Sequence, residues 1–459
     1  MTGLSHLVAR ATKDTIDLRP LTASEFASWR SEQSQEVQTW LDATGFSAVA
    51  GTTALVPAAD GSVAEVLVGV GRLDDIWAYG GLPHGLPEGR YRLHEAADGD
   101  VSRAVALGWA LGGYRFTRYK TPERSPASLV WPSGVDRSAI SRPADATHLV
   151  RDLINTPAED MGPPQLAAAA RAVGRAHGAK VSVITGDALL RQNYPTIHTV
   201  GRAADRASRL VDLRWGTKGP RITLVGKGVC FDSGGLNLKP TSGISLMKKD
   251  MGGAAHALGV AQMIMAAELP VRLRLLLPAV ENSVSGNAFR PRDIITTRKG
   301  LTVEVGNTDA EGRLILCDAL TEADRESPDL LVDFATLTGA ARVALGSELP
   351  ALFCNDDDVA HAALEHGLAQ QDPLWRMPLH QPYKALLNSP VADINNLAEG
   401  YGGAVTAALF LEHFVEQAKA WIHIDVMAWN LADKPGRPAG GEAMGLRAIA
   451  ALIDEIATR

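Results

Sequence analysis

Beyond residue 145, short runs of consecutive apolar residues alternate with longer stretches whose apolar residues recur every three or four positions. The short runs predict buried strands, and the longer stretches predict helices. Strands and helices that alternate in this way indicate a mainly parallel sheet covered by helices on both faces. The predicted strands are KVSVITG, RITLVGKG, VRLRLLLPAV, LTVEVG and LLVDFATL, and the predicted helices are GGAAHALGVAQMIMAAEL and EGRLILCDALTEADR. Ligands bind such sheets at the carboxyl ends of the strands, where we expect Lys227, Asp309 and Thr336 to meet.

The preceding part of the chain has a different pattern, which we interpret as a smaller α/β domain. β-rich runs separated by a Pro/Gly/Asp turn occupy residues 46–71, and the apolar stretch 102–114 is typical of a short helix. Residues 121–143 are rich in Pro and Ser, as loop boundaries are. The predicted fold is therefore α/β with two domains, a smaller N-terminal one over residues 1–144 and a larger C-terminal one over residues 145–459.

Composition and charge limit the class of partner. The chain of 459 residues is 46% hydrophobic and 21% charged, and its net charge is −7 without any lysine- or arginine-rich run. Nucleic acid is therefore not an expected partner, because a phosphate backbone attracts concentrated positive charge. Three widely spaced cysteines favour reduced thiols, and neither a signal peptide nor an apolar run of ~18 residues is evident. We expect a cytoplasmic protein without a membrane span.

The stretch VEVGNTDAEGRL, residues 303–314, admits two interpretations. Thr308 and Glu311 have the Thr-x-x-Glu spacing of a capping box, in which side chains cover the free N–H groups of a helix start. Alternatively, Asp309 and Glu311 bind one centre together. Two residues apart, they would diverge on a helix but share one face of an extended segment, so the second interpretation requires a loop that enters a helix here.

Carboxylates and basic residues gather in this stretch and in residues 226–255. They are Lys227, Asp232, Lys239, Asp250, Asp309, Glu311 and Arg313. Four carboxylates cannot all stay ionised in a desolvated pocket without a counter-charge, because like charges raise one another's pKa. Two divalent cations, roughly 3.5–4 Å apart, would neutralise them and clamp an attacking water. Beside such ions one lysine would lose its proton and ligate a metal, and a second would stay charged and polarise a carbonyl.

At these residues the sequence resembles the leucyl aminopeptidase (cytosol aminopeptidase) family of dizinc exopeptidases. The matching motifs are INTPAEDM, VGKGVCFDSGGLNLKP, MKKDMGGAA, ENSVSGNAFRPRDIITTRKG, NTDAEGRLILCDAL and GGAVTAALFLEHFV, in the family's order and spacing. They cover residues 145–459, which the resemblance makes the catalytic domain, whereas the N-terminal domain is inferred from position only. The implied activity is metal-dependent release of N-terminal leucine or other apolar residues from peptide substrates.

The resemblance also implies a role for each metal-site residue. Asp232 and Glu311 would bridge two metal ions, Asp309 would complete one site, and Lys227 and Asp250 would complete the other. Zinc is the expected ion, and manganese, cobalt or magnesium could replace the more labile one, as oxygen-rich ligands permit. The family's homohexamer is likewise implied.

Catalytic and substrate-binding roles follow from the same resemblance. Lys239 would stabilise the oxyanion formed when a metal-bridged hydroxide attacks, and Arg313 would hold a bicarbonate ion that acts as general base. The pocket for the N-terminal side chain would be shaped by Met247, Thr336 and Gly339, with a main-chain contact from Leu337. Gly306 departs from the family, which has an apolar residue there. We expect it to loosen the loop without touching a ligand.

Other conspicuous residues have simpler interpretations. HAALEH, residues 361–366, is one residue too widely spaced for an inverted zinc-protease motif, so we expect a solvated helix face. CNDDD, residues 354–358, is expected in a surface loop or at a helix N-terminus, where acids favour the dipole. His423 is expected to be a core or interface histidine. Lys248 and Lys249 are expected to be surface charges or supporting neighbours of a metal ligand.

A second class of function is also open, because some bacterial members of the family serve as DNA-binding accessory or regulatory proteins. That role needs a basic groove across an oligomer, and a net charge of −7 with scattered arginines gives it little support. A catalytically silent scaffold is a third interpretation. It conflicts with the ligand positions, each of which holds the expected residue type.

Overall fold

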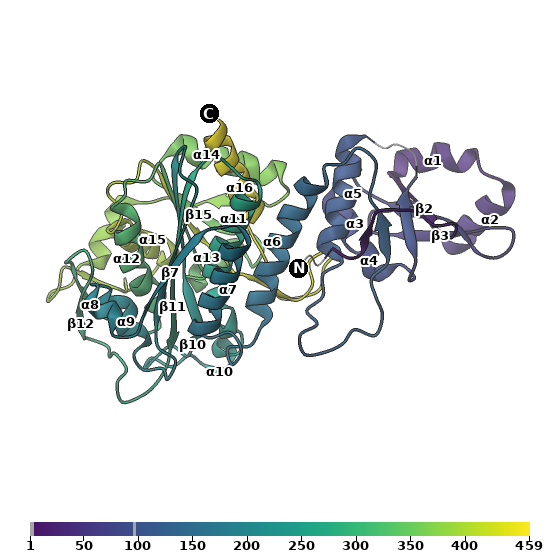
Figure 1. The fold of residues 1–459 in the computed structure, drawn as a ribbon. Coiled ribbons are helices and arrows are strands. Elements are labelled where there is room, and N and C mark those ends of the chain that lie inside the picture. The colour runs from purple at the N-terminus through teal and green to yellow at the C-terminus, as the bar shows by residue number, and fades with distance from the viewer. Residues whose placement is uncertain (1–3, 95–97) are drawn as a thin grey trace. The chain divides into compact units, whose positions relative to one another are not determined.

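The structure, a computed structural model, describes residues 4–94 and 98–459. The chain divides into two compact units, Met1–His148 with Ala432–Ala439, and Leu149–Leu431 with Gly440–Arg459. Residue 145, the boundary expected from the sequence, lies inside the continuous helix α6 (Arg137–Asn155) (Figure 1).

The N-terminal unit contains a six-stranded sheet with the order β1-β6-β5-β2-β4-β3. Its neighbouring strands are parallel within the described residues, except for the antiparallel pair β3 and β4. The strands are β1 (Leu7–Val8), β2 (Ile16–Leu21), β3 (Thr53–Pro57), β4 (Val63–Gly69), β5 (Arg90–Leu93) and β6 (Ser128–Val130). The helices are α1 (Ala23–Ser31), α2 (Gln35–Thr44), α3 (Ile76–Gly80), α4 (Leu82–Gly85) and α5 (Gly99–Gly112).

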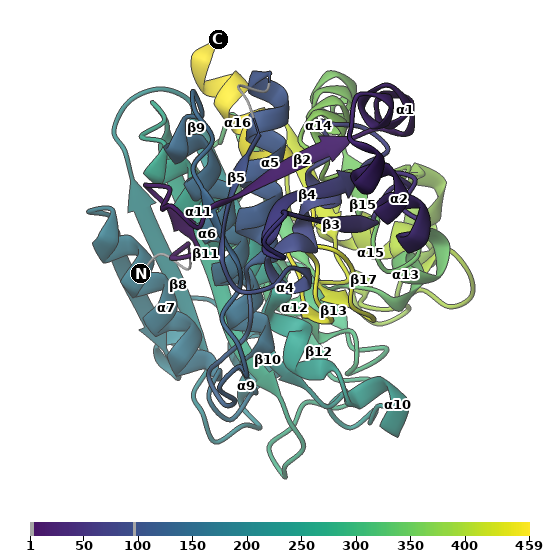
Figure 2. The same ribbon diagram turned by 90° about the vertical axis from the view of Figure 1, so that its right-hand side faces the viewer.

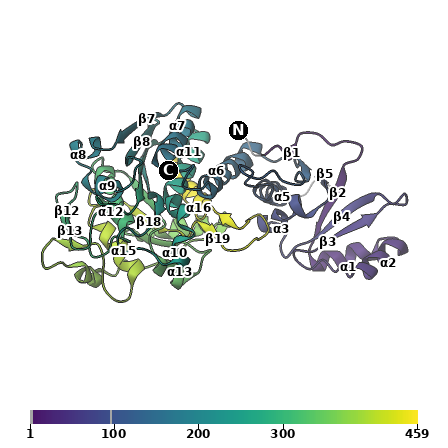
Figure 3. The same cartoon turned by 90° about the horizontal axis from the view of Figure 1, so that it is seen from below.

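Successive side chains of β4 pack into two different cores of this unit. Val66 and Val68 belong to a cluster that includes the apolar face of α5. Leu67 belongs to a second cluster, with Phe26 of α1 and Leu41 of α2. These two helices lie beside β3 and β4 (Figure 3). This alternation follows from the two-residue period of a strand. The N-terminal unit is thus an α/β domain, as predicted.

The second unit is built on a nine-stranded sheet with the order β16-β15-β18-β14-β9-β11-β8-β7, and β10 pairs with β11. The sheet is mixed but mostly parallel, and the long β11 runs antiparallel beside β8 (Figure 2). The strands are β7 (Lys180–Thr185), β8 (Arg209–Trp215), β9 (Arg221–Gly226), β10 (Gly228–Asp232), β11 (Arg272–Asn282), β14 (Leu330–Ala335), β15 (Ala351–Cys354), β16 (Trp375–Arg376) and β18 (Trp421–Asp425).

Helices cover both faces of this sheet, which confirms the predicted fold class. α7 and α11 pack on one face, with α16 on α11, while α9 and α12 pack on the other, with α15 behind α12 (Figure 1). The helices are α7 (Pro163–Ala176), α8 (Ala188–Arg191), α9 (Pro195–Gly201), α10 (Thr241–Ile244), α11 (Gly252–Ala266), α12 (Glu311–Asp324), α13 (Gly339–Leu345), α14 (Asp357–Ala369), α15 (Gly403–Glu412) and α16 (Leu446–Thr458), with the 3-10 helices η1 (Met247–Met251) and η2 (Gln381–Leu387). None of the described helices combines the length and the apolar character that a membrane crossing requires.

One predicted strand is not part of the main sheet. LTVEVG forms β13 (Thr302–Glu304), which pairs with β12 (Ile294–Thr296) and β17 (Ile394–Asn395) in a separate three-stranded sheet. Its apolar and polar residues alternate, which is the pattern of a strand with one apolar face and not of a central parallel strand. The remaining two strands, β19 (Trp429–Asn430) and β20 (Gly440–Gly441), form a short antiparallel pair.

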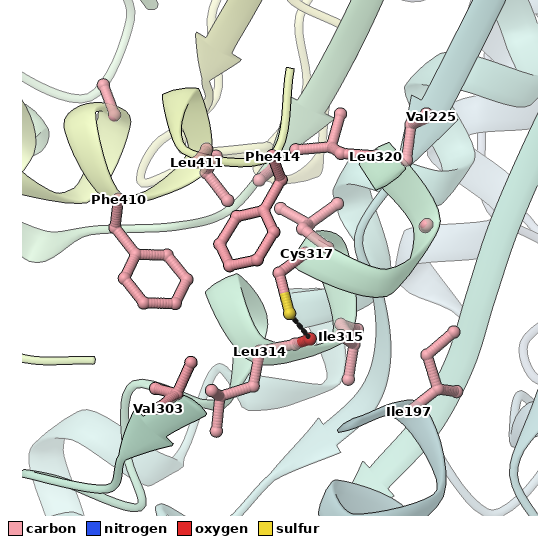
Figure 4. Close-up of a cluster of buried hydrophobic side chains, with 14 of the residues drawn as sticks. Ile197, Val225, Val303, Leu314, Ile315, Cys317, Leu320, Phe410, Leu411 and Phe414 are labelled. Atoms are coloured by element: carbon pink, nitrogen blue, oxygen red, sulfur yellow. Dashed lines mark hydrogen bonds between the residues drawn. The ribbon is translucent and has the colours of Figure 1, made fainter. Parts of the chain in front are cut away.

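A hydrophobic cluster holds α12 in place against its neighbours. Leu314 and Cys317 of α12 pack with Ile197 of α9 and Phe410 of α15, and the Cys317 Sγ lies 3.0 Å from the carbonyl oxygen of Leu314 (Figure 4). This packing positions the first turn of α12, which carries Glu311, as a rigid part of the fold.

A buried ion pair gives a testable prediction about stability. The Arg151 Nε lies 2.9 Å from the Glu442 Oε1, and the two side chains are 0% and 3% exposed. Arg151→Met would leave a buried carboxylate without its counter-charge, so we expect the free energy of unfolding to fall by about 3–5 kcal/mol in denaturant titrations. Arg290→Met, which removes an exposed pair with Asp293, is the control and should cost less than about 1 kcal/mol. Equal losses in both variants would contradict the prediction.

Candidate metal centre

The polar side chains of the site follow the ends of neighbouring strands in the main sheet. β9 leads directly into Lys227, β10 ends at Asp232, and β14 leads into Thr336. Asp250 lies in η1, which packs beside β10 and continues into α11. Asp309 reaches the same place from the loop after β13, outside this sheet.

Lys227 is the central cation of the cluster. Its Nζ lies 2.9 Å from both the Asp250 Oδ2 and the Glu311 Oε1, and it donates to the carbonyl oxygen of Thr336 at 2.9 Å. The side chain is 3% exposed. Burial alone would lower the pKa of this ammonium, but the charges of Asp250 and Glu311 outweigh it and raise the pKa above its ordinary value.

Three carboxylates converge beside Lys227. Asp232, Asp309 and Glu311 each offer an oxygen within 4.8 Å of the other two. The Lys239 Nζ bridges the more open side of this group, 2.9 Å from the Asp232 Oδ2 and 2.5 Å from the Asp309 Oδ1. Neighbouring carboxylates, Asp232 first, overcome the effect of burial and raise the pKa of Lys239.

Burial and mutual repulsion raise the pKa values of three carboxyl groups in this cluster. Burial, together with the charge of Asp232, raises the pKa of Glu311 to about 8 and that of Asp309 to about 6. Burial also raises the pKa of Asp250, although Lys227 opposes it. At neutral pH and without metal ions, the protonated carboxyl group of Glu311 and the ammonium groups of Lys227 and Lys239 therefore limit the net charge of the cluster.

The donor set fits divalent metal ions. Among the described residues, the Asp250 Oδ2, the Asp309 Oδ1 and the Glu311 Oε1 are buried and accept no hydrogen bond of good geometry, although each lies at ion-pair distance from a lysine. Buried oxygens are rarely left without a partner, so these atoms are available to another electrophile. Carboxylate oxygens with one amine nitrogen suit zinc, manganese, cobalt or magnesium.

The capping-box interpretation of Thr308 is wrong. α12 begins at Glu311, and its N-cap residue Ala310 makes no side-chain capping bond. The hydroxyl of Thr308 instead donates to the carbonyl oxygen of Gly234 at 2.6 Å and accepts from the backbone N–H of Asn237 at 2.9 Å. Thr308 therefore ties the loop before α12 to the loop after β10, and Asp309 precedes the helix as the metal interpretation requires.

Two glycines of the NTDAEGRL region allow close packing. A Cβ on Gly312 would lie 2.6 Å from the Lys227 Nζ, so only glycine leaves room for that ammonium. A Cβ on Gly306 would lie 2.4 Å from the Asn395 Oδ1, while the Gly306 N–H donates to the Asn396 Oδ1 at 2.7 Å. Glycine at position 306 therefore lets the end of β17 approach this loop closely.

Arg313 is buried in the first turn of α12. Its Nη1 donates to the carbonyl oxygen of Asn396 at 2.6 Å, and its guanidinium lies over the ring of Phe410. Burial lowers the pKa of Arg313 to about 10, and its Nε has no hydrogen-bond partner among the described residues.

A cavity of about 310 Å³ opens onto the cluster. The predicted site residues that line it are Lys227, Asp232, Lys239, Met247, Asp250, Asp309, Thr336, Leu337 and Gly339. Glu311 and Arg313, which are buried in α12, are not among the described residues that line it. The structure thus brings the predicted residues together, nine of them around one cavity and two behind it.

The sequence interpretation missed several residues of this site. Of the two expectations for Lys249, the surface charge is wrong and the neighbour of a metal ligand agrees with the structure, because Lys249 is 6% exposed and lines the cavity next to Asp250. Burial lowers its pKa to about 8. Asn282 donates to the Asp232 Oδ1 at 2.8 Å and to the carbonyl oxygen of Thr308 at 3.0 Å. Asp425 ends β18 and accepts from the backbone N–H of Leu337 at 2.9 Å. The sequence does contain a signal for Asn282 and Asp425. Each follows an apolar run and ends a central strand, and polar residues at strand ends are candidates for a binding site.

The simpler interpretations of other residues agree with the structure where it describes them. His423 is fully buried, and its Nδ1 lies 2.6 Å from the Asp333 Oδ1 on the neighbouring strand. Asp356 accepts from the Val359 N–H at 2.9 Å and caps α14, so the CNDDD acids begin a helix. His361 lies on an exposed face of that helix.

Comparisons with known proteins match both units. The model of the cytosol aminopeptidase family, catalytic domain, matches residues 148–450, and that of the M17 aminopeptidase N-terminal domain matches residues 16–132. The chain is 40% identical over 376 residues to a probable cytosol aminopeptidase of Nitratidesulfovibrio vulgaris, covering 77% of this chain and 74% of the relative. It is 40% identical over 382 residues to a peptidase B of Pectobacterium carotovorum, covering 79% and 87%.

Solved structures of similar proteins point to the same family as the sequence comparisons. The crystal structure of a cytosol aminopeptidase from Coxiella burnetii is 48% identical with a TM-score of 0.95, and the match covers 98% of this chain and 99% of the other. The bottromycin maturation enzyme BotP, in complex with Mn, is 33% identical with a TM-score of 0.87, covering 97% and 100%. These matches confirm the resemblance found in the motifs. The chain belongs to the M17 cytosol (leucyl) aminopeptidase family, and it is an aminopeptidase of the metallo-exopeptidase class.

Proposed function

We propose that this aminopeptidase uses two divalent ions. Asp232 and Glu311 would be shared between them, Asp309 would help to hold one ion, and Lys227 and Asp250 would help to hold the other. The observation that carries this proposal is the convergence of three carboxylates within 4.8 Å, next to buried oxygens that lack hydrogen bonds in the described part of the chain. When bound, the ions supply a Lewis acid for the substrate carbonyl and lower the pKa of an attacking water toward neutrality.

Lys239 is proposed to stabilise the negative charge that develops on the substrate carbonyl oxygen. The Lys239 side chain is 15% exposed and lines the cavity. In the structure its ammonium pairs with Asp232 and Asp309. Once ions neutralise these two carboxylates, the ammonium can donate to a developing oxyanion.

Arg313 is proposed to hold a bicarbonate ion that serves as general base. A buried guanidinium nitrogen without a hydrogen-bond partner in the described residues is a suitable donor for a small anion. Main-chain atoms of Leu337 are proposed to contact the substrate.

The remaining assignments also belong to the proposal. Met247, Thr336 and Gly339 shape the pocket for the N-terminal side chain, and the apolar wall that Met247 contributes suits leucine. Zinc is the expected ion, with manganese, cobalt or magnesium at the exchangeable site. A homohexamer and a cytoplasmic location are expected, with peptides as the substrates.

Metal reconstitution tests this proposal. Protein stripped with a chelator is expected to lose hydrolysis of leucyl-p-nitroanilide and Leu-Gly, because the ions supply the Lewis acid. Added zinc or manganese should restore it, with activity saturating at two ions per chain. N-acetylated substrates are the control and should stay intact, since an exopeptidase recognises a free amine. Full activity in metal-free protein, or saturation at a single ion, would contradict the proposed centre.

A further inference from the structure

The cavity beside the metal centre carries two cations that the proposed mechanism does not use. Lys249 lines it from η1, and Arg342 lines it from α13. Lys249 is 6% exposed, whereas Arg342 is among the exposed residues. Lys249 therefore lies deep in the cavity, and Arg342 lies nearer its opening.

Neither acid close to Lys249 is paired with it. Asp250, its neighbour in the chain, lies 2.9 Å from the Lys227 Nζ. Asp425 lines the same cavity, but its carboxylate accepts from the Leu337 N–H at 2.9 Å and from the Thr338 hydroxyl at 2.7 Å. Within residues 4–94 and 98–459, the Lys249 Nζ has no hydrogen bond and no ion pair.

Arg342 is similarly available. Its Nη1 lies 3.8 Å from the sulfur of Met427, and no carboxylate of the described residues forms an ion pair with it. Two cations at different depths of one cavity thus form no ion pair with a carboxylate of the described chain, although Asp250 and Asp425 attract Lys249 over a longer distance. An ammonium that is nine-tenths buried normally has a partner, because desolvating an unpaired charge is costly.

A ligand carboxylate is the partner that this arrangement lacks. Besides these cations, the cavity is lined by the apolar residues Leu246, Met247 and Met427. Such a wall suits the methylene groups of an acidic side chain whose charged end reaches Lys249. A charge-assisted hydrogen bond to a carboxylate is about twice as strong as a neutral one, so the ammonium would favour an acid over its amide.

We propose that this cavity binds the side-chain carboxylate of an N-terminal acidic residue, glutamate above all, through Lys249, with Arg342 attracting it at the entrance. The inference rests on the proposed function, because the cavity adjoins the centre proposed to hold the scissile bond. It adds acidic N-terminal residues to the apolar ones expected as substrates, and makes Lys249 a specificity-determining residue.

Glutamate and glutamine have nearly the same shape and differ in charge, so comparing them isolates the effect of the ammonium. The metal-loaded enzyme should hydrolyse glutamyl-p-nitroanilide with a kcat/KM about 10- to 100-fold above that for the glutaminyl substrate, as one charge-assisted hydrogen bond predicts. In Lys249→Met this ratio should fall to about one. Lys248→Met is the matched control, because the Lys248 Nζ donates to the Asn155 carbonyl oxygen at 2.7 Å and should leave the ratio unchanged.

Calorimetric titration of the metal-loaded enzyme with free L-glutamate and L-glutamine provides a readout independent of turnover. Glutamate should bind at least about tenfold more tightly, and Lys249→Met should abolish the difference. If leucyl substrate is hydrolysed but the wild-type glutamate preference is absent, the acidic subsite is refuted and the proposed function stands. A preference that survives Lys249→Met refutes the role of Lys249. If no substrate is hydrolysed, the proposed function fails, and calorimetry alone decides the subsite.

Discussion

Replacing Glu311 by glutamine is expected to lower kcat/KM on leucyl substrates by about 10³-fold or more and to remove at least one bound ion. An amide is a poor metal ligand, and losing an ion removes the Lewis acid that activates the attacking water. Glutamine keeps the size of a side chain that is 1% exposed, so the packing of α12 should persist. Metal content by mass spectrometry and kcat/KM with saturating zinc measure the two effects.

The charge of the metal-free site makes this variant informative. Burial and Asp232 raise the pKa of Glu311 to about 8, so at pH 7 the metal-free wild type carries a protonated carboxyl there. Glutamine has the same charge as that form, and the metal-free proteins should have similar Tm values. Added metal should raise the Tm of the wild type more than that of the variant, because only the native state binds the ions tightly.

Glu304→Gln is the matched control for this experiment. Glu304 is 2% exposed, but its Oε1 pairs with Arg292 outside the cluster. The control should therefore retain its full metal content and metal-induced rise in Tm. Full metal content and activity in Glu311→Gln would show that Glu311 is not a ligand.

Lys239→Ala is expected to lower kcat by about 10²–10³-fold while two ions remain bound. The proposed role of Lys239 lies in the transition state, where a lost oxyanion donor typically costs this much. A donor used only there lowers kcat and kcat/KM equally and leaves KM nearly unchanged. Steady-state kinetics with leucyl-p-nitroanilide, together with metal analysis of the same sample, measures both quantities.

A structural role for Lys239 would give a different result. In the structure its Nζ holds Asp232 and Asp309 together, so its loss could instead disperse these carboxylates. In that case metal content would fall along with activity. Lys239→Arg, which restores a cation, should recover part of kcat if charge is what matters. Full activity in Lys239→Ala would refute the assigned role.

Several features of this fold could be predicted because they depend on local sequence. The apolar runs that became β9, β11 and β14, and the periodic stretches that became α11 and α12, bury continuous apolar surface wherever they are placed. The carboxyl ends of parallel strands lie at one edge, so Lys227 and Thr336 were expected to meet there. The clustering of acids around them was also predicted, because these acids lie in two short segments, residues 226–255 and 303–314.

Other features depended on contacts between distant segments. Thr308 satisfied the spacing of a capping box, yet its hydroxyl bonds to Gly234, which lies 74 positions away in the chain. LTVEVG was expected in the main sheet, but its alternating pattern placed β13 beside β12 and β17 instead. For Thr308 the local pattern was compatible with two environments, and its distant partners decided between them. For LTVEVG the alternation itself favoured a strand with one apolar face.

Lys249 shows most clearly the difference between what the local sequence determines and what the tertiary structure determines. By itself the sequence determined the order of strands and helices, the sheet class, and the residue types available to a metal centre, because these follow from periodicity and from short motifs. Only the tertiary structure decided that Lys249 is buried in the cavity while Lys248 points to Asn155. A lysine stem packs equally well along a surface or inside a pocket. Its environment is therefore set by segments far away in the chain, which no local pattern encodes.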